Sequence, residues 1–480
     1  MRISRLQCPA VCLALGAAVA AGGTAVFAQA AVAGSAAAPP AVQAQAREIF
    51  AHIVGIESSI GQGKVPLVAK YLAERFKTGG FPESDIHILP LGETASLVVR
   101  FRGNGKAGRP IAFLAHMDVV TAKRVDWQRD PYVLTEENGF FFGRGTADVK
   151  QEVALLTATF LRLKSEGFVP SRDLILAFSG DEETAQATAR DLATVHRELV
   201  DAEFAINGDG GGGVLAEGTA KPLLFYVQGA EKSSAQYLLT TRNSGGHSSQ
   251  PRPDNAIYEL ADALKAVQRY AFPLKWNEWT LGDFKAASAV TAGPLGEAMA
   301  RYAADPGNAA AAAEIARNPA FVGRLRTTCI ATLLSGGHAE NALPQSATAT
   351  INCRIFPGTS AADVQRTLQG LVGPQVEVRQ GYEALVSDAS PMRADLMKAV
   401  AHAVQASSPG TPVVPTQAAY ATDGAVFRNA GIPTYGAGGV FVMGSEEFAH
   451  GLDERIRVPE FYKALIFWDV LIKALAGRGS

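Results

Sequence analysis

The chain has 480 residues, of which 48% are hydrophobic, and its formal net charge is −2. This length allows more than one packed domain, and the near balance of charge gives no field that would attract nucleic acid or anionic lipid. Small molecules or peptides are therefore the expected partners, and nucleic acid is not.

The first thirty residues differ in composition from the rest. Arg2 and Arg5 precede an apolar run over 10–27, which an Ala-Gln-Ala tripeptide over 28–30 follows. This order is typical of a secretory signal peptide with its cleavage site. The alternative is a membrane anchor, but the run is rich in Ala and Gly rather than in Leu, Ile and Val. We expect 1–30 to be cleaved, leaving a periplasmic or secreted protein without membrane attachment.

The next segment, 31–46, is rich in Ala, Pro and Gln and is expected to be a disordered lead-in. From 47 to 221 the hydrophobic pattern alternates between helical and strand-like periods. Such alternation predicts an α/β sheet with helices on both faces. The predicted helices cover 47–57, 65–76 and 149–164, and the predicted buried strands cover 96–101, 111–115, 174–178 and 204–206.

The pattern changes over 222–356, which we expect to form a smaller α+β domain. The α/β pattern resumes over 357–480, so one sheet domain is interrupted by another. The smaller domain is predicted to contain strands at 235–241, 326–334 and 347–356, a helix at 255–270 and an Ala-rich helical insertion at 288–317. The returning part is predicted to contain helices at 362–371, 393–406 and 459–475 and a strand at 432–435.

Two cysteines, Cys329 and Cys353, remain after removal of 1–30. They lie on two predicted strands joined by a turn, and antiparallel pairing would place them opposite each other. Disulfides persist in an oxidising compartment, but cross-strand neighbours seldom have the geometry that a disulfide needs. A disulfide and two buried free thiols both remain open.

Polar side chains follow the predicted strands of the sheet domain. His116 ends the strand at 111–115, and Asp118 is close enough to hold the second ring nitrogen of a metal-binding histidine. Ligands bind at the carboxyl ends of strands in open α/β sheets. Asp148 ends a Gly-rich turn, where a carboxylate taken alone more often caps a helix.

Three adjacent acids, Asp181 to Glu183, follow the strand at 174–178, and they would repel one another without a cation. Asp209 ends the strand at 204–206 in the same way, and a further histidine lies in a polar loop far down the chain. Two histidines and three carboxylates form a nitrogen and oxygen ligand set that suits zinc, with cobalt or manganese as substitutes. The candidate ligands are His116, Asp148, Glu183, Asp209 and His450.

These motifs, in this order from residue 47 to the end of the chain, resemble the co-catalytic zinc peptidases and deacylases. That family includes glutamate carboxypeptidase, acetylornithine deacetylase, succinyl-diaminopimelate desuccinylase and carboxypeptidase S. The resemblance implies a mixed-sheet catalytic domain flanked by helices and interrupted by a lid, which usually forms a homodimer interface. It also implies two zinc ions per chain, one on His116 and Asp209, the other on Glu183 and His450, with Asp148 bridging them.

The resemblance assigns further roles. Glu182 corresponds to the general base, and Asp118 to the residue that orients the first histidine. His247, in a Gly-Gly-His motif, resembles the histidine that polarises the scissile carbonyl, often from the partner subunit. Asn341 and Arg354 resemble the residues that bind the substrate carboxylate.

We therefore expect hydrolysis of an amide bond in a small peptide, as in a carboxypeptidase or dipeptidase. An N-acyl-amino-acid deacylase is the alternative within the class, and a non-catalytic periplasmic peptide-binding protein is the alternative from another class. Asp209 stands where the deacetylases and glutamate carboxypeptidase have Glu, so the substrate class stays open. The insertion at 288–317 enlarges the lid.

Overall fold

A computed structural model describes residues 37–382 and 384–477 of the chain, so the predictions for 1–30 lie outside the described part. Its first helix is α1 (Pro40–Val54), which begins inside the expected disordered lead-in. That expectation is wrong from residue 40 onward. Ala46, Ile49 and Phe50 recur at helical spacing and are fully buried in the apolar core of the sheet domain, so tertiary packing orders the helix despite the Ala-, Pro- and Gln-rich composition of its first turns.

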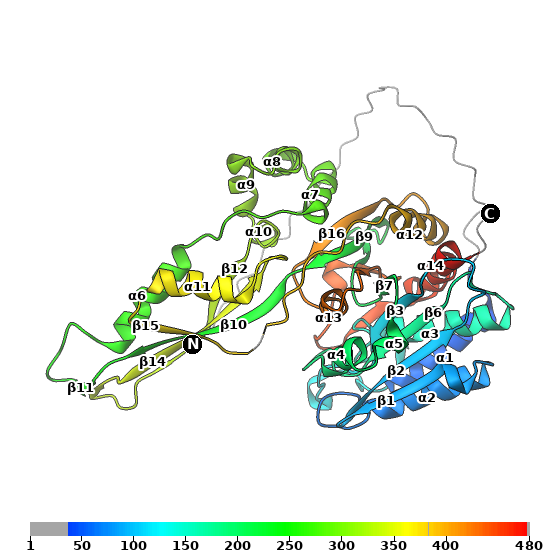
Figure 1. Cartoon of the computed structure of the whole chain (residues 1–480), viewed down its shortest axis with the longest axis horizontal. Helices are drawn as coiled ribbons and strands as arrows, with labels where there is room; N and C mark the ends of the chain where they lie inside the picture. The colour runs from blue at the N-terminus through cyan, green and yellow to red at the C-terminus, as the bar shows by residue number, and fades with distance from the viewer. Residues whose placement is uncertain (1–36, 383, 478–480) are drawn as a thin grey trace. The chain divides into compact units, whose positions relative to one another are not determined.

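The described part of the chain contains a mixed sheet of ten strands (Figure 1). In spatial order these are β1 (Ile86–Leu91), β2 (Thr94–Phe101), β6 (Leu174–Ser179), β3 (Ile111–His116), β7 (Phe204–Asn207), β17 (Thr434–Gly436), β9 (Pro222–Glu231), β8 (Gly212–Leu215) and β18 (Phe441–Met443), while β16 (Val413–Ala418) pairs with β9. Strands β6, β3, β7 and β17 run parallel to one another. Their carboxyl ends therefore meet at one edge of the sheet.

Helices cover both faces of this sheet. Alternate side chains of β3 point to opposite faces, so Phe113 joins one apolar core and Leu114 joins the other. The first core packs against α1, α2 (Val65–Thr78), α3 (Lys150–Ser165), α12 (Ala394–Ser407) and α14 (Val458–Ala476). The second packs against α4 (Ala187–Thr194), α13 (Gly424–Asn429) and the short α5 (Arg197–Val200). Burial on both faces explains the uninterrupted apolar runs of the central strands.

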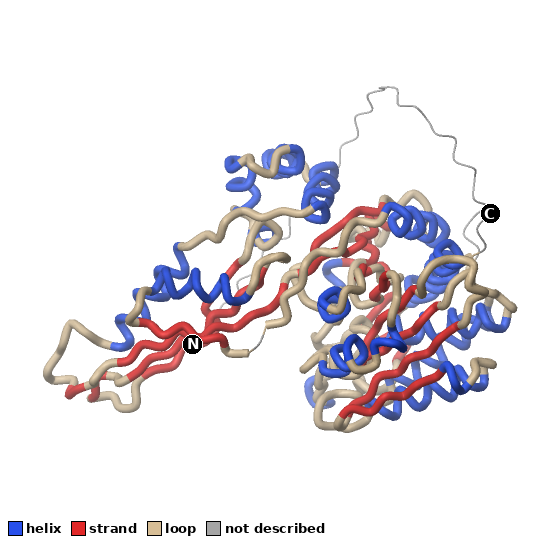
Figure 2. The backbone as a smooth tube through the Cα atoms, in the orientation of Figure 1, coloured by secondary structure: helices blue, strands red, loops and turns tan. Residues whose placement is uncertain are grey.

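A second sheet in the described part has four antiparallel strands (Figure 2). Its order is β12 (Thr328–Gly336), β14 (Ser346–Ile355), β10 (Ser233–Arg242) and β15 (Val376–Gln380), and α6 (Ala256–Arg269) and α11 (Ala361–Val372) pack on it. The smaller domain was expected to span 222–356, but the strand pairing places β9 in the main sheet and β15 in the small sheet. By this pairing both boundaries of the smaller domain lie further along the chain than expected. Only Lys232 separates β9 from β10, so no turn marks the crossing.

The predicted Ala-rich insertion forms α8 (Gly293–Ala304) and α9 (Ala309–Ala316), flanked by α7 (Glu278–Val290) and α10 (Pro319–Val322). These helices enclose a small core of their own around Phe284 and Met299. Helix α7 lies against β16, where Trp279 is fully buried and its indole N–H donates to the Ser390 carbonyl at 2.7 Å. Helix α7, which precedes the insertion, therefore covers β16, and β16 pairs with β9.

Cys329 on β12 and Cys353 on β14 are directly opposite in the register and form a disulfide. The shorter elements of the described part are β4 (Thr135–Glu137), β5 (Phe140–Phe142) and β19 (Arg455–Arg457) in one sheet, β11 (Gly246–His247) and β13 (Ala342–Leu343) in another, and the 3₁₀ turns η1 (Glu83–Asp85), η2 (Arg124–Asp126) and η3 (Gly444–Glu446).

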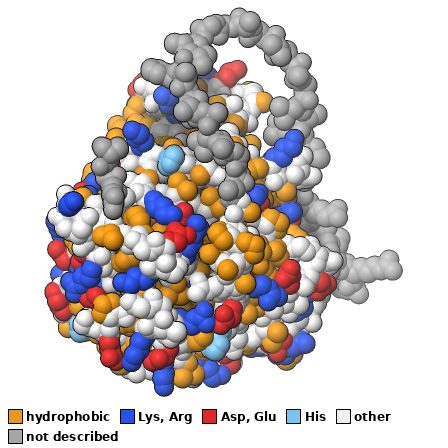
Figure 3. Space-filling model, turned by 90° about the vertical axis from the view of Figure 1, so that its right-hand side faces the viewer, with side chains coloured by type: hydrophobic (Ala, Val, Ile, Leu, Met, Phe, Trp, Pro, Cys, Tyr) orange, Lys and Arg blue, Asp and Glu red, His pale blue; other side chains and the backbone are white. Residues whose placement is uncertain are grey.

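Basic, acidic and hydrophobic side chains are interspersed on the visible surface in Figure 3, so this face carries no dominant charge of one sign. Among the described helices, none combines the length and the hydropathy that crossing a membrane requires.

Candidate metal centre

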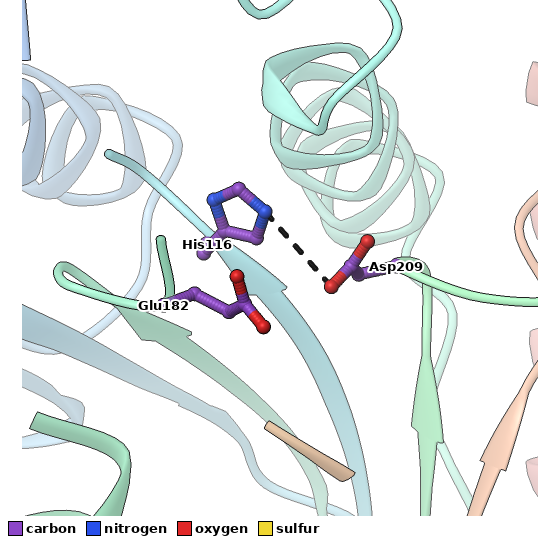
Figure 4. Close-up of side chains that lie close together, drawn as sticks. All are labelled: His116, Glu182 and Asp209. Carbon is purple, nitrogen blue, oxygen red and sulfur yellow. Dashed lines mark ion pairs between the residues drawn. The ribbon is translucent and has the colours of Figure 1, made fainter. Parts of the chain in front are cut away.

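The carboxyl ends of β3, β6 and β7 bring together side chains from three separate motifs. His116 is the last residue of β3 and is 1% exposed. The loop after β6 carries Glu182, and the loop after β7 carries Asp209. Figure 4 shows the three side chains turned toward a common space, with His116 Nε2 at 3.9 Å from Asp209 Oδ2.

Asp148 lies between two histidines. It lies two residues before α3, and its peptide bond to Val149 is cis. Its Oδ1 is 3.0 Å from His116 Nε2, and its Oδ2 is 3.0 Å from His450 Nε2. His450 Nε2 also lies 3.0 Å from the carboxylate of Glu183. The structure thus brings all five sequence-predicted ligands into one cluster, with Asp148 at its middle.

Asp118 organises the residues around it by hydrogen bonding. Its carboxylate oxygens accept the backbone N–H groups of Glu182 and Glu183, each at 3.1 Å. Its backbone carbonyl lies 3.0 Å from Nδ1 of His116, and one carboxylate oxygen lies 3.5 Å from the same nitrogen. Such contacts fix the orientation of the imidazole and leave Nε2 directed toward Asp148.

The donor set fits a pair of divalent metal ions. Two groups of described residues place one ligand atom each within 4.8 Å of one another: His116 with Glu182 and Asp209, and His116 with Asp148 and Glu183. Imidazole nitrogen and carboxylate oxygen are ligands that zinc accepts readily. Glu182 is itself a member of the first group, so one of its carboxylate oxygens lies within 4.8 Å of the ligand atoms of His116 and Asp209.

The ionisation of the cluster reflects crowded negative charge. Burial raises the pKa of Asp209 well above its ordinary value, although the charge of His116 opposes this. Burial, reinforced by the charge of Asp209, also raises the pKa of Glu182. Burial acts in the same direction on Asp148, but hydrogen bonds from His116 and His450 outweigh it and lower the pKa of that carboxyl. Cations would relieve the remaining repulsion.

A cavity of about 350 Å³ opens onto the cluster. Glu182, Glu183, Asp148, Asp209 and His450 line its polar side. Val440, Val442 and Ile456 line an apolar side, and Tyr420 and Thr422 also contribute. The volume is in the range of small-molecule sites, so the cavity has room for a compact substrate.

The three residues with predicted roles in the smaller domain are not among those that line this cavity. His247 lies on β11 and is exposed, with its Nδ1 at 2.8 Å from the Ser249 hydroxyl. Asn341 is nearby, because its carbonyl accepts the N–H of Ser248. Arg354 is exposed on β14, opposite Thr328. The described chain alone therefore does not bring these side chains to the metal cluster.

Sequence reasoning missed two buried carboxylates that support the cluster. Glu454 is fully buried, accepts the backbone N–H of Ala147 at 2.7 Å and that of Asp148 at 3.1 Å, and pairs with Arg144. Asp423 accepts the hydroxyl of Ser179, the residue paired with His116 across β6 and β3. One sequence signal could have pointed to Glu454, namely its position four residues after His450. Asp423 had none.

A mixed sheet with helices on both faces, a separate antiparallel small sheet, and a nitrogen and oxygen ligand cluster at the strand ends together indicate a metal-dependent hydrolase. The chain belongs to Peptidase family M20/M25/M40, whose profile matches residues 112–474. The protein is thus a hydrolase of a dinuclear-metal peptidase family, as the resemblance of the motifs implied.

Individual relatives agree with this assignment. The human N-fatty-acyl-amino acid synthase/hydrolase PM20D1 is 25% identical over 401 residues, which cover 79% of this chain and 77% of that protein. The M20 family metallo-carboxypeptidase Sso-CP2 from Sulfolobus solfataricus has a TM-score of 0.68 at 18% identity, covering 89% of this chain and 98% of that one. The YXEP protein of Bacillus subtilis, a dinuclear metal binding peptidase, has a TM-score of 0.59 at 11% identity, covering 91% and 99%. The predicted fold class is confirmed.

Proposed function

We propose that the protein hydrolyses the amide bond of a small peptide or an N-acyl amino acid, with Glu182 as the general base. The observation that carries this proposal is the meeting of five ligand side chains and Glu182 in one cluster, of which Glu182 and all the ligands except His116 line one cavity. Membership of a family of metallopeptidases and amidohydrolases supports the reaction type, and the cavity volume supports a compact substrate.

The geometry supports one division of the ligands. His116 and Asp209 would hold one ion, and Glu183 and His450 the other. Asp148 would bridge them, because each of its oxygens already faces a different histidine. We assign zinc to both positions, with cobalt or manganese as working substitutes.

When bound, the metal pair would supply Lewis acidity and lower the pKa of a water molecule. Glu182 removes a proton from that water as its oxygen bonds to the amide carbon. The C–N bond then breaks, and Glu182 returns the proton to the leaving amine nitrogen. Asp118 acts by position, since its hydrogen bonds hold the backbone of Glu182 in place.

The substrate class draws support from two relatives. PM20D1 acts on N-fatty-acyl amino acids, and Sso-CP2 is a carboxypeptidase. Both names describe substrates in which the released amino acid carries a free carboxylate. Arg354 and Asn341 would bind this carboxylate after the smaller domain of this chain or of a partner subunit has approached the cavity, because neither residue lines the cavity of the single chain. We favour peptide hydrolysis, with N-acyl-amino-acid hydrolysis as the alternative that the apolar wall of Val440 and Val442 supports. A dipeptide panel assayed beside N-acyl amino acids separates the two.

We also assign a homodimer through the smaller domain, with His247 completing the cavity of the partner subunit and stabilising the developing oxyanion. Strand β12 supports this, because it ends the order of the small sheet and exposes Ile330 by 68%, Leu333 by 66% and Leu334 by 68%. A long exposed apolar edge strand is otherwise an aggregation hazard. Light scattering should show that the Leu334→Lys variant is a monomer, and an activity assay should show that this monomer has lost turnover. A fully active monomer would contradict the role of His247.

Export to the periplasm or medium, with cleavage after the tripeptide at 28–30, completes the proposal. The disulfide between Cys329 and Cys353 supports an oxidising compartment. Amino-terminal sequencing of the protein recovered from a producing culture tests it, since an intact Met1 in the active protein would contradict cleavage.

Glu182→Gln is the direct test of the catalytic proposal. It keeps the size of the side chain but removes the proton acceptor, so turnover should fall by about 10²–10⁴-fold while bound metal stays unchanged. Glu74→Gln, on the exposed face of α2, serves as the matched control. Near wild-type turnover of Glu182→Gln would overturn the base assignment. A wild-type protein that binds peptides but turns over neither substrate class would indicate a non-catalytic binding protein instead.

A further inference from the structure

A second cavity, of about 230 Å³, lies in the smaller domain. It is bounded by the end of α6, the ends of α9 and α10, the start of β12 and the second half of α11. It shares no lining residue with the cavity at the metal centre. The Ala-rich insertion supplies part of its wall through Ala316, and the flanking helix α10 supplies Val322.

The walls of this cavity are mostly apolar. Val267, Phe272, Leu368 and Leu371 supply them from α6 and α11 and the loop after α6. Arg326 is the charged residue of the lining. A lone cation in a hydrophobic cavity is the arrangement that recognises an apolar anion, because the charge orients a ligand whose burial the walls favour.

Arg326 has unused hydrogen-bonding capacity. Its Nη1 donates to the Phe272 carbonyl at 3.1 Å, but its Nε is buried without an acceptor. Among the described residues, no carboxylate lies within ion-pair distance of its guanidinium, whereas Arg324 two positions earlier pairs with Asp283 at 2.8 Å. A buried N–H without a partner is unfavourable, and a ligand oxygen would satisfy it.

A second buried donor in the smaller domain also lacks a hydrogen-bond partner. The hydroxyl of Tyr302, on α8, is buried without a hydrogen-bond partner. Tyr302 is not among the residues that line the cavity. Burial raises the pKa of Tyr302 to about 12, and the charge of Arg326 offsets part of this rise. The cavity itself therefore combines a positive charge, a spare N–H donor on Arg326 and apolar walls.

We propose that this cavity binds an apolar monocarboxylate, with its hydrocarbon chain among the side chains of α6 and α11 and its carboxylate on Arg326. At the ~30 Å³ that a water molecule occupies, the cavity holds roughly eight non-hydrogen atoms, which is the size of hexanoate. A guanidinium matches a carboxylate through paired N–H groups, so the anion is preferred over a neutral molecule of equal length.

Calorimetric titration of the full purified protein with hexanoate tests this site. Arg326→Gln should weaken hexanoate binding by at least about tenfold, because it removes the charge-assisted contacts. Arg317→Gln is the matched control, since Arg317 pairs with Glu314 on the insertion and does not line the cavity. Hexanol, which has the same chain without the charge, should bind the wild type at least about tenfold more weakly than hexanoate.

Two further measurements keep the test decisive. Val322→Trp fills the cavity while leaving Arg326 intact, so it should abolish hexanoate binding even if Arg326→Gln fails to fold. Binding must also persist after chelation of metal, because carboxylates bind metal ions directly. The proposal is overturned if the wild type does not bind hexanoate at millimolar concentration, if folded Arg326→Gln and Val322→Trp both bind like the wild type, or if chelation abolishes binding.

Discussion

Replacing Glu454 tests whether a buried ion pair holds Asp148 in place. Glu454 is fully buried, and its two oxygens serve Arg144 on one side and the N–H groups of Ala147 and Asp148 on the other. Glu454→Ala would leave the guanidinium of Arg144, which is 3% exposed, without its counter-ion. Breaking a buried pair in this way costs about 3–5 kcal/mol, so the free energy of unfolding should fall by that amount.

The substitution should also weaken metal binding, because Asp148 loses the acceptor that fixes its backbone. Urea unfolding at pH 8 measures the first effect, and competition with a chelator measures the second. Burial raises the pKa of Glu454 to about 7, against the pull of Arg144, so pH 8 keeps the wild-type carboxyl largely ionised. Glu446→Ala, which removes a partly exposed pair with Arg457, should cost about 1 kcal/mol or less. Equal stability and metal affinity of Glu454→Ala and the wild type would refute the reasoning.

Three further predictions concern the packing of the two domains. Burial raises the pKa of Glu152 from 4.5 to about 7, so between these pH values only the unfolded state ionises this carboxyl. As the pH rises from about 4.5 to about 7, the free energy of unfolding of the metal-free wild type should therefore fall by roughly 3 kcal/mol relative to that of Glu152→Gln. Urea unfolding of both proteins over this pH range measures the difference, and the same pH dependence in both would contradict the prediction. In the same assay, Trp279→Ala should lower the free energy of unfolding by about 3–5 kcal/mol, because Trp279 is fully buried. Trp276 is 47% exposed, so Trp276→Ala should lower it by about 0.5 kcal/mol. Equal losses would contradict a stabilising contact of α7 with the main sheet. Replacing Cys329 and Cys353 by Ser removes a disulfide between residues 24 apart in sequence, and the free energy of unfolding should fall by about 3 kcal/mol. An unchanged urea midpoint would argue against a stabilising disulfide.

The sheet domain and most of its metal cluster could be predicted because their signals are local. Each of His116, Glu183 and Asp209 follows a buried apolar strand, and parallel strands bring such loops together. The position of His450 beside Asp148 depends on tertiary structure, so only the resemblance to a known family linked them.

Other features had no local signal. The first turns of α1, before the predicted start at residue 47, were missed because they consist mainly of Ala, Pro and Gln, and only Ala46 among them is buried. The small sheet begins at β10 rather than β9 because the chain crosses between sheets without a turn at Lys232. The supporting carboxylates Asp423 and Glu454 lie far in sequence from the groups they contact, and their partners are mostly backbone or hydroxyl groups that leave no pattern.

The central claim is that the cluster binds two metal ions on either side of Asp148. Anomalous diffraction at the zinc edge, from crystals of the zinc-loaded protein, tests it most directly. The account predicts two peaks per chain, one in contact with His116 and Asp209, the other with Glu183 and His450, and a carboxylate oxygen of Asp148 next to each. A single peak, or a pair of peaks that does not contact Asp148, would contradict it.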